Sequence, residues 1–176
     1  MSESLPDYLS VPPEKLGAGV PVKFRTCGAM EDIADDMARV MLELIEAARS
    51  EGWGATLIVP VGPVDQFPVL AERINQRRYD CRDVMLINMD EYLTSDDQWV
   101  PVDHPLSFRG FMNRKFYDLI DPALAPRPEN RVFPDPLDPE KIQRLIDGRG
   151  GVDACFGGIG INGHIAFNEP PEPGEQ

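Results

Sequence analysis

The residues best suited to chemistry lie in one glycine-rich stretch, residues 157–170, which reads GGIGINGHIAFNEP. It contains Asn162 and His164, and Glu169 follows the histidine by five residues. A nearby carboxylate can fix the tautomer of an imidazole and stabilise its protonated form. The spacing therefore indicates a histidine prepared for proton transfer. The alternative is a loop histidine with only a structural hydrogen bond.

A second candidate group is the acidic pair Asp90 and Glu91, which directly follows the apolar run 83–89. The run 152–156, just before the glycine-rich stretch, has the same apolar character. Parallel strands end at one edge of their sheet, so we expect Asp90 and His164 to face one crevice. A carboxylate beside an imidazole can move a proton on a sugar or α-amino carbonyl carbon. For an isolated acidic pair, a solvated strand end would be the simpler interpretation.

Three glycines in the loop, Gly158, Gly160 and Gly163, match the pattern G-x-G-x-x-G. A dinucleotide site would also need a helix that opens at the third glycine, yet residues 165–170 lack a helical apolar period. We therefore predict that these glycines, together with Glu91, approach a small substrate closely. The chain has only two histidines and contains no H-x-H or C-x-x-C pair of ligands, which argues against a zinc site.

The elements that must position these residues alternate along the chain. The apolar patterns predict strands at 22–26, 55–61, 83–89 and 152–156, and helices at 30–48, 67–77, 107–120 and 139–148. Two local signals place the start of the last helix: Asp138 as its N-cap, and a hydrophobic staple between Leu137 and Ile142. This order predicts an α/β fold with a mainly parallel sheet. We assign residues 1–21 to an extended N-terminal arm and 22–176 to a single domain.

Composition narrows the classes of partner. The 176 residues carry a net charge of -13, which argues against nucleic acid and against an anionic membrane surface. The three cysteines, Cys27, Cys81 and Cys155, are predicted to be reduced core residues. No signal peptide or membrane-length apolar run is visible, so a cytoplasmic protein is the default expectation. The tail 170–176, PPEPGEQ, contains no element that would cover the last strand of a parallel sheet. We therefore expect the chain to be incomplete at its C-terminus.

Three strings together resemble the glucosamine-6-phosphate deaminases, also called isomerases, over roughly residues 22–171. They are NMDEY at 88–92, HPLSF at 104–108 followed by Phe111 and Met112, and the glycine-rich stretch. The resemblance implies a doubly wound α/β sheet with helices on both faces. It also implies conversion of glucosamine 6-phosphate and water to fructose 6-phosphate and ammonia, without a metal or organic cofactor. Such an enzyme belongs to amino-sugar catabolism and takes a small-molecule amino sugar phosphate.

The resemblance also suggests roles for single residues. Asp90 matches the base that moves a proton between C2 and C1, and His164 matches the histidine that assists ring opening. Glu169 matches one of two carboxylates that orient this histidine. The other position, normally aspartate, is Asn162 here. In a serine-protease triad the same loss of charge costs about 10⁴ in kcat. Because Glu169 can compensate, we expect a smaller loss, and we expect Asn162→Asp to raise activity.

A second departure lies at 61–65, VGPVD, where the family has a Thr-Gly-(Gly/Ser)-(Thr/Ser)-Pro run that holds the sugar phosphate. Gly62 is retained and is predicted to bind substrate, but the hydroxyls are lost, Pro63 has no amide donor and Asp65 adds a like charge. Three alternatives stay open: a divergent enzyme for another amino sugar, with or without a phosphate; a non-catalytic sugar-binding or regulatory module; and a lactone hydrolase of similar fold. A homo-oligomer is compatible with the resemblance, although no residue requires one.

Overall fold

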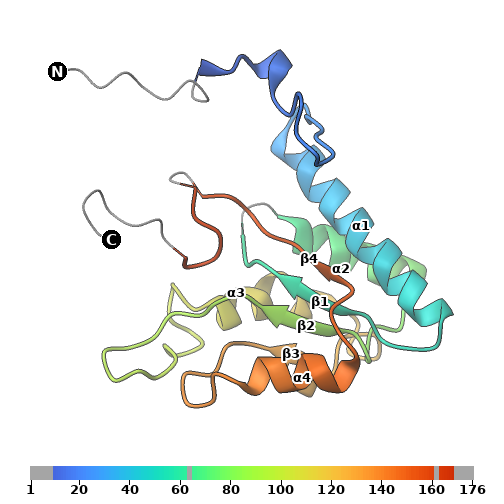
Figure 1. The fold of residues 1–176 in the computed structure, drawn as a ribbon. Helices are drawn as coiled ribbons and strands as arrows, with labels where there is room; N and C mark the ends of the chain where they lie inside the picture. Colours follow the sequence, from blue (N-terminus) through green and yellow to red (C-terminus); the bar gives the residue numbers. More distant parts are fainter. Residues whose placement is uncertain (1–9, 63–64, 161–162, 169–176) are drawn as a thin grey trace.

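The computed structural model describes residues 10–62, 65–160 and 163–168 (Figure 1). Helices and strands alternate along these residues. In chain order they are α1 (Met30–Ser50), β1 (Thr56–Val59), α2 (Gln66–Arg77), β2 (Met85–Asn88), α3 (Phe108–Lys115), β3 (Arg131–Val132), α4 (Lys141–Arg149) and β4 (Ala154–Cys155). Three short 3-10 turns add to them, at Pro13–Lys15, Tyr117–Leu119 and Pro128–Asn130. No helix in this part of the chain is long and apolar enough to cross a membrane.

The strands form one parallel sheet in the order β3-β2-β1-β4. β1 pairs with β2 from Thr56 opposite Met85, and with β4 from Leu57 opposite Ala154. All strands therefore end at the same edge of the sheet, as the sequence predicted. The fold is α/β, and the apolar runs at 55–61 and 83–89 are confirmed as its two central strands.

Helices cover both faces of the sheet (Figure 1). Alternate residues of β1 and β2 point to opposite sides, since side chains alternate along a strand. Leu57, Val59 and Leu86 join the main core, to which α1, α2 and α3 contribute. Met85 and Ile87 pack on the other side, against apolar residues of α4. The doubly wound arrangement is thus confirmed.

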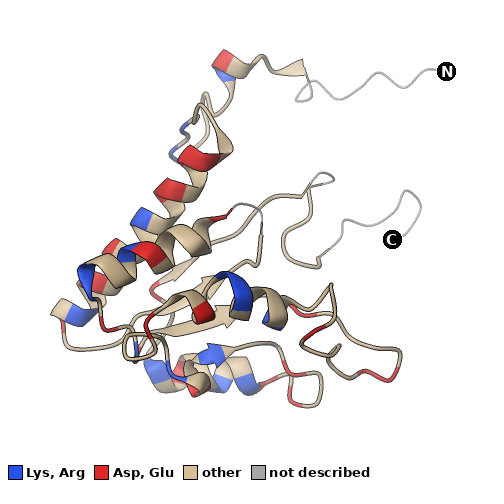
Figure 2. Ribbon diagram, turned by 180° about the vertical axis from the view of Figure 1, so that it is seen from behind, with Lys and Arg blue, Asp and Glu red and all other residues tan. Residues whose placement is uncertain are grey.

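The amphipathic pattern of α1 explains its place in the fold. Its buried residues recur at helical spacing and face α2: Ala34, Ala38, Met41, Leu42, Ile45 and Ala48. Acidic and basic residues are interspersed along the helix (Figure 2), and Arg39 pairs with Asp36 and Glu43. At the N-terminus, the Asp32 carboxylate accepts the Ala29 amide at 3.1 Å.

Two predictions about strands and cysteines were wrong. Residues 22–26 are exposed and form no strand, because no described strand lies beside them to pair with. Of the cysteines, only Cys81 is buried. Cys155 is exposed because β4 lies at the edge of the described sheet. β3 was not among the strands expected from the sequence, because its two residues lie in the Pro-rich segment 121–138.

Helix boundaries near proline and aromatic residues also differ from prediction. α3, predicted over 107–120, begins after Ser107, whose side chain caps it, but ends at Lys115, where the chain turns to bury Phe116. α4 begins three residues after Asp138, whose side chain pairs with Arg144 at 2.5 Å instead of capping the helix. The predicted hydrophobic staple is absent, since Leu137 is 75% exposed.

Candidate active site

A cavity of about 210 Å³ lies where β1, β2 and β4 end. Its lining joins four segments that are distant in sequence. They are the turn after β1 (Pro60, Val61, Gly62), the end of β2 (Met89, Asp90), the start of α3 (Phe108) and the glycine-rich loop (Gly158, Ile159, Gly160, His164, Ala166, Phe167). The sheet thus brings together five residues that the sequence singled out: Gly62, Asp90, Gly158, Gly160 and His164.

A second cavity of about 430 Å³ shares Val61, Gly62 and Phe108 with the first. Asp65 also lines it, and the Lys115 ammonium lies 3.7 Å from that carboxylate. Pocket volumes of a few hundred Å³ suit small metabolites. The shared lining makes the two cavities parts of one recess at the carboxyl edge of the sheet.

A tight turn holds His164 over the backbone of the loop. The Gly160 amide donates to the His164 carbonyl oxygen at 2.9 Å, and the Gly163 amide donates to the Gly160 carbonyl at 3.0 Å. A Cβ at position 160 would lie 2.2 Å from Cε1 of His164, so the imidazole packs directly on this glycine. Gly163 has a φ of +88°, which glycine adopts without strain. Gly163 therefore shapes the turn and does not line the cavity.

The electrostatics of Asp90 fit a group that exchanges protons. Its carboxyl is half-buried, and this burial raises its pKa above the usual value. The charge of neighbouring Glu91 raises the pKa further, whereas His164 lowers it. Asp90 and His164 are therefore close enough to interact, and a carboxylate with a raised pKa is a better base than an exposed one.

Glu91 does not line either part of the recess, although we predicted contact with the substrate. Its side chain is fully buried, and its oxygens accept the backbone amides of Phe108 and Arg109, each at 2.9 Å. Both carboxylate oxygens are thus already occupied by the start of α3. These contacts favour a structural role for Glu91.

Aromatic residues that carried no predicted role complete the wall. Tyr92, Phe108 and Phe167 form a trio, with ring centroids 4.9–5.7 Å apart. This trio joins the end of β2, the start of α3 and the glycine-rich loop. Each aromatic residue lies within three residues of a predicted site residue or helix cap, and that proximity was the only sequence signal for it.

Two predicted residues, Asn162 and Glu169, lie outside the described residues. Within the part of the chain that is described, no group of three or more His, Cys, Asp and Glu side chains is arranged to hold a metal. The geometry supports proton transfer by Asp90 and His164.

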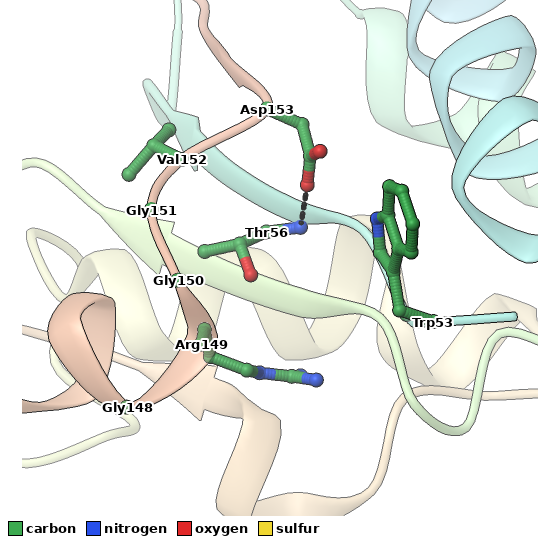
Figure 3. Close-up of a pocket in the computed structure, with 9 residues that line it drawn as sticks. Trp53, Thr56, Gly148, Arg149, Gly150, Gly151, Val152 and Asp153 are labelled. Atoms are coloured by element: carbon green, nitrogen blue, oxygen red, sulfur yellow. Dashed lines mark hydrogen bonds between the residues drawn. The ribbon is translucent and has the colours of Figure 1, made fainter. Parts of the chain in front are cut away.

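A cavity of about 490 Å³ lies at the opposite edge of the sheet, where Trp53 and Arg149 line it (Figure 3). There Asp153 accepts the Thr56 amide at 2.7 Å and ties the start of β1 to the segment before β4. None of the predicted site residues lies there. Sites in open α/β sheets form at the carboxyl ends of strands, and so we assign the candidate active site to the recess at that edge of the sheet.

Comparison with known proteins supports the same family. The chain is 33% identical to a glucosamine-6-phosphate deaminase from Caenorhabditis elegans over 144 residues, which are 80% of this chain and 52% of the relative. It is 35% identical to that of Porphyromonas gingivalis strain W83 over 118 residues, 64% of this chain and 42% of the relative. No family model matches the chain.

The fold agrees with the sequence comparison. A solved structure described as a monomeric glucosamine-6-phosphate deaminase of the NagB superfamily superimposes with a TM-score of 0.67 and 26% identity. The superposition covers 85% of this chain and 60% of that one. The chain spans about half the length of the curated relatives it matches. It is therefore a homologue of the glucosamine-6-phosphate deaminases, in sequence and in fold, over the part of their length that it spans.

Proposed function

We propose that the protein acts as a glucosamine-6-phosphate deaminase, an isomerase that converts an amino sugar phosphate to a ketose phosphate and ammonia. The observation that carries the proposal is the cavity that Asp90, just after β2, and His164, in the glycine-rich loop, both line. The named relatives, which are glucosamine-6-phosphate deaminases, support this choice of substrate.

The proposed chemistry divides the proton transfers between two groups. His164 carries out the proton transfer at the ring oxygen as the pyranose ring opens. Asp90 then removes the proton from C2 and returns it to C1. The oxygen on C1 gains a proton as the amino group loses one, which leaves an imine at C2. Water hydrolyses this imine to the ketone and ammonia, so the overall reaction consumes one water. We propose that Glu169 and Asn162 orient His164, and that Gly62, Gly158 and Gly160 let the substrate approach the backbone.

We further propose the cytoplasm as the site of action and N-acetylglucosamine catabolism as its context. Both rest on the sequence-based expectations and on the class of the relatives. Whether copies of the chain associate is a separate question, which light scattering on the purified protein answers directly.

Ammonia release by the complete natural protein tests the proposal. Glucosamine 6-phosphate and unphosphorylated glucosamine are supplied in parallel, with Asp90→Asn as the control that lacks the base. Release from the phosphate ester, abolished in Asp90→Asn, is the expected result. Release from glucosamine alone would identify a different amino-sugar enzyme. Binding without release from either sugar would contradict an enzymatic role.

A further inference from the structure

The buried carboxylate of Glu91 occupies the N-terminus of α3. Its Oε1 accepts the Phe108 amide and its Oε2 accepts the Arg109 amide, both at 2.9 Å. Ser107 completes the cap, because its Oγ accepts the Gly110 amide at 3.1 Å and donates to Oε2 of Glu91 at 3.2 Å. The first amides of a helix have no partner within it. Here the first three are all satisfied, by one carboxylate and one hydroxyl.

Arg109 extends this cluster to the loop before α3. Its Nε donates to Oε2 of Glu91 at 3.0 Å, and its NH2 group donates to the Val100 carbonyl. The guanidinium also lies 4.5 Å from the centre of the Trp99 ring. Glu91 therefore ties the end of β2 to both the loop and the helix that follow it.

Phe108 is the residue whose position depends most directly on these bonds. It is the first residue of α3, and its ring lines both cavities of the recess. The ring packs on Tyr92 at 5.1 Å and on Phe167 at 5.7 Å, between centroids. Phe167 belongs to the loop that carries His164. A shift of the α3 terminus would thus move the wall of the site and the support of the histidine loop.

We propose that Glu91 is a positioning residue of this site: it holds Phe108 against the end of β2 and keeps a fixed negative charge beside Asp90. The part that concerns turnover rests on the proposed function. Glu91 itself touches no substrate.

The charge of Glu91 is maintained by its partners. Burial opposes ionisation, but the amides of Arg109, Phe108 and Tyr92 and the Arg109 side chain together lower the pKa of Glu91. Two neighbouring titratable groups act on Asp90: Glu91, which raises its pKa, and His164 from the glycine-rich loop, which lowers it. Arg109, on α3, faces Glu91. The ionised Glu91 therefore strengthens Asp90 as a base.

Two substitutions separate the two roles of Glu91, which are to hold Phe108 in position and to keep a negative charge beside Asp90. Glu91→Gln keeps the length and loses the charge. Glu91→Asp keeps the charge but is too short by one methylene to reach the α3 amides. We would titrate the Asp90 carboxyl by carbon NMR, follow the Phe108 ring resonances, and measure the pH profile of kcat and KM. Glu72→Gln, an exposed change on α2, is the matched control.

Glu91→Gln should lower the pKa of Asp90 and move the acid limb of the kcat/KM profile to lower pH. Glu91→Asp should shift the Phe108 resonances and reduce kcat/KM by about 100-fold, the typical effect of a misplacement of about 1 Å. The control should change none of these.

An unchanged pKa of Asp90 in Glu91→Gln, together with a raised KM, would overturn the proposal and restore Glu91 as a substrate contact. If Glu91→Gln does not fold, Glu91→Asp decides, because unchanged Phe108 resonances and kcat/KM would also overturn it. If the wild-type protein turns over no amino sugar, the proposed function fails. The NMR titration and ring shifts still test the role of Glu91 in that case, since they need no substrate.

Discussion

Asp90 is the residue whose surroundings most directly indicate a chemical task. It lies two residues after the fully buried strand β2, it is half-buried itself, and it lines the same cavity as His164. Burial and the charge of Glu91 disfavour its ionised form. The folded protein therefore holds Asp90 in a state that costs stability at neutral pH, as is common for residues kept for function.

Asp90→Asn should slow proton exchange at C2 of the substrate by about 10² to 10⁴, the usual contribution of a general base. The substitution should also raise the midpoint temperature of thermal unfolding at pH 7. Since the pKa of Asp90 is raised in the folded state, its stabilising protonated form is lost as pH rises through that value, and asparagine avoids this loss. The gain should vanish below the ordinary aspartate pKa of about 3.9.

Deuterium exchange followed by NMR and thermal unfolding at both pH values check these outcomes. Asp96→Asn, in an exposed turn, is the control. Retained exchange would remove Asp90 as the base, and a lower midpoint at pH 7 would contradict the sign of its pKa shift.

Gly160 supports the histidine through its lack of a side chain. Gly160→Ala should displace the His164 ring, because the new Cβ would lie 2.2–2.5 Å from three ring atoms. We expect kcat/KM to fall about 100-fold, as for other misplaced catalytic groups. The comparison is Gly148→Ala in α4, where no atom lies within 4 Å of the new Cβ. That change should leave kcat/KM alone and stabilise the helix by about 0.5–1 kcal/mol. Equal activities of the two variants would contradict the packing of His164 on Gly160.

At the scale of elements, α3 connects the core to the candidate site. Met112 and the neighbouring Phe116 are buried in the main core, while Phe108 lines the recess. The helix has only eight residues, too few to be stable alone. Its stability depends on this packing and on its N-terminal cap.

Ser107→Ala should therefore destabilise the protein by about 1 kcal/mol, within the usual range of about 0.5–2 kcal/mol for a lost N-cap. Both hydrogen bonds of the Ser107 hydroxyl, to Gly110 and Glu91, would be lost. Urea unfolding measures the change, and Ser95→Ala in an exposed turn should be neutral. A neutral Ser107→Ala would mean that Glu91 alone suffices to cap α3.

At the scale of the whole molecule, the described residues divide into a packed α/β body and an exposed N-terminal segment. Residues 21–32 are all exposed, and the first buried residue is Ala34 in α1. The assignment of residues 1–21 to an arm stays a prediction, since exposure alone does not define a domain boundary.

Removal of residues 1–21 should change the free energy of unfolding by less than about 0.5 kcal/mol, as for changes at exposed sites. The shortened protein keeps Arg25, which pairs with Asp36 of α1. Met41→Ala, in the fully buried part of the same helix, should cost about 2–5 kcal/mol and shows that the assay responds. A loss from the truncation as large as that from Met41→Ala would place the arm within the folded domain.

Local sequence patterns were sufficient for the main elements. β1 and β2 are continuous apolar runs, and α1 and α2 have an apolar face at helical spacing, so each pattern follows from burial of that element. The same patterns placed Asp90 and His164 at strand ends, and the topology confirms that both line one cavity. Residues 22–26 show the limit of this reasoning, because a strand also needs a partner, and no local pattern supplies one.

Only the tertiary structure decided the features that depend on contacts between distant segments. β3 has only two residues, and it forms because it pairs with β2, where Leu86 lies opposite Arg131. The Pro-rich sequence around β3 contains no local pattern that predicts this pairing. Asp90 and Glu91 are neighbouring acidic residues after the same strand, and their sequence context does not distinguish them. In the structure, Glu91 caps α3, whereas Asp90 lines the cavity. The amino-acid sequence alone determined the fold class, the two central strands and the candidate base and histidine, since these follow from local polarity and periodicity. Their pairing, burial and hydrogen-bond partners required the folded chain, because each is set by residues tens of positions away.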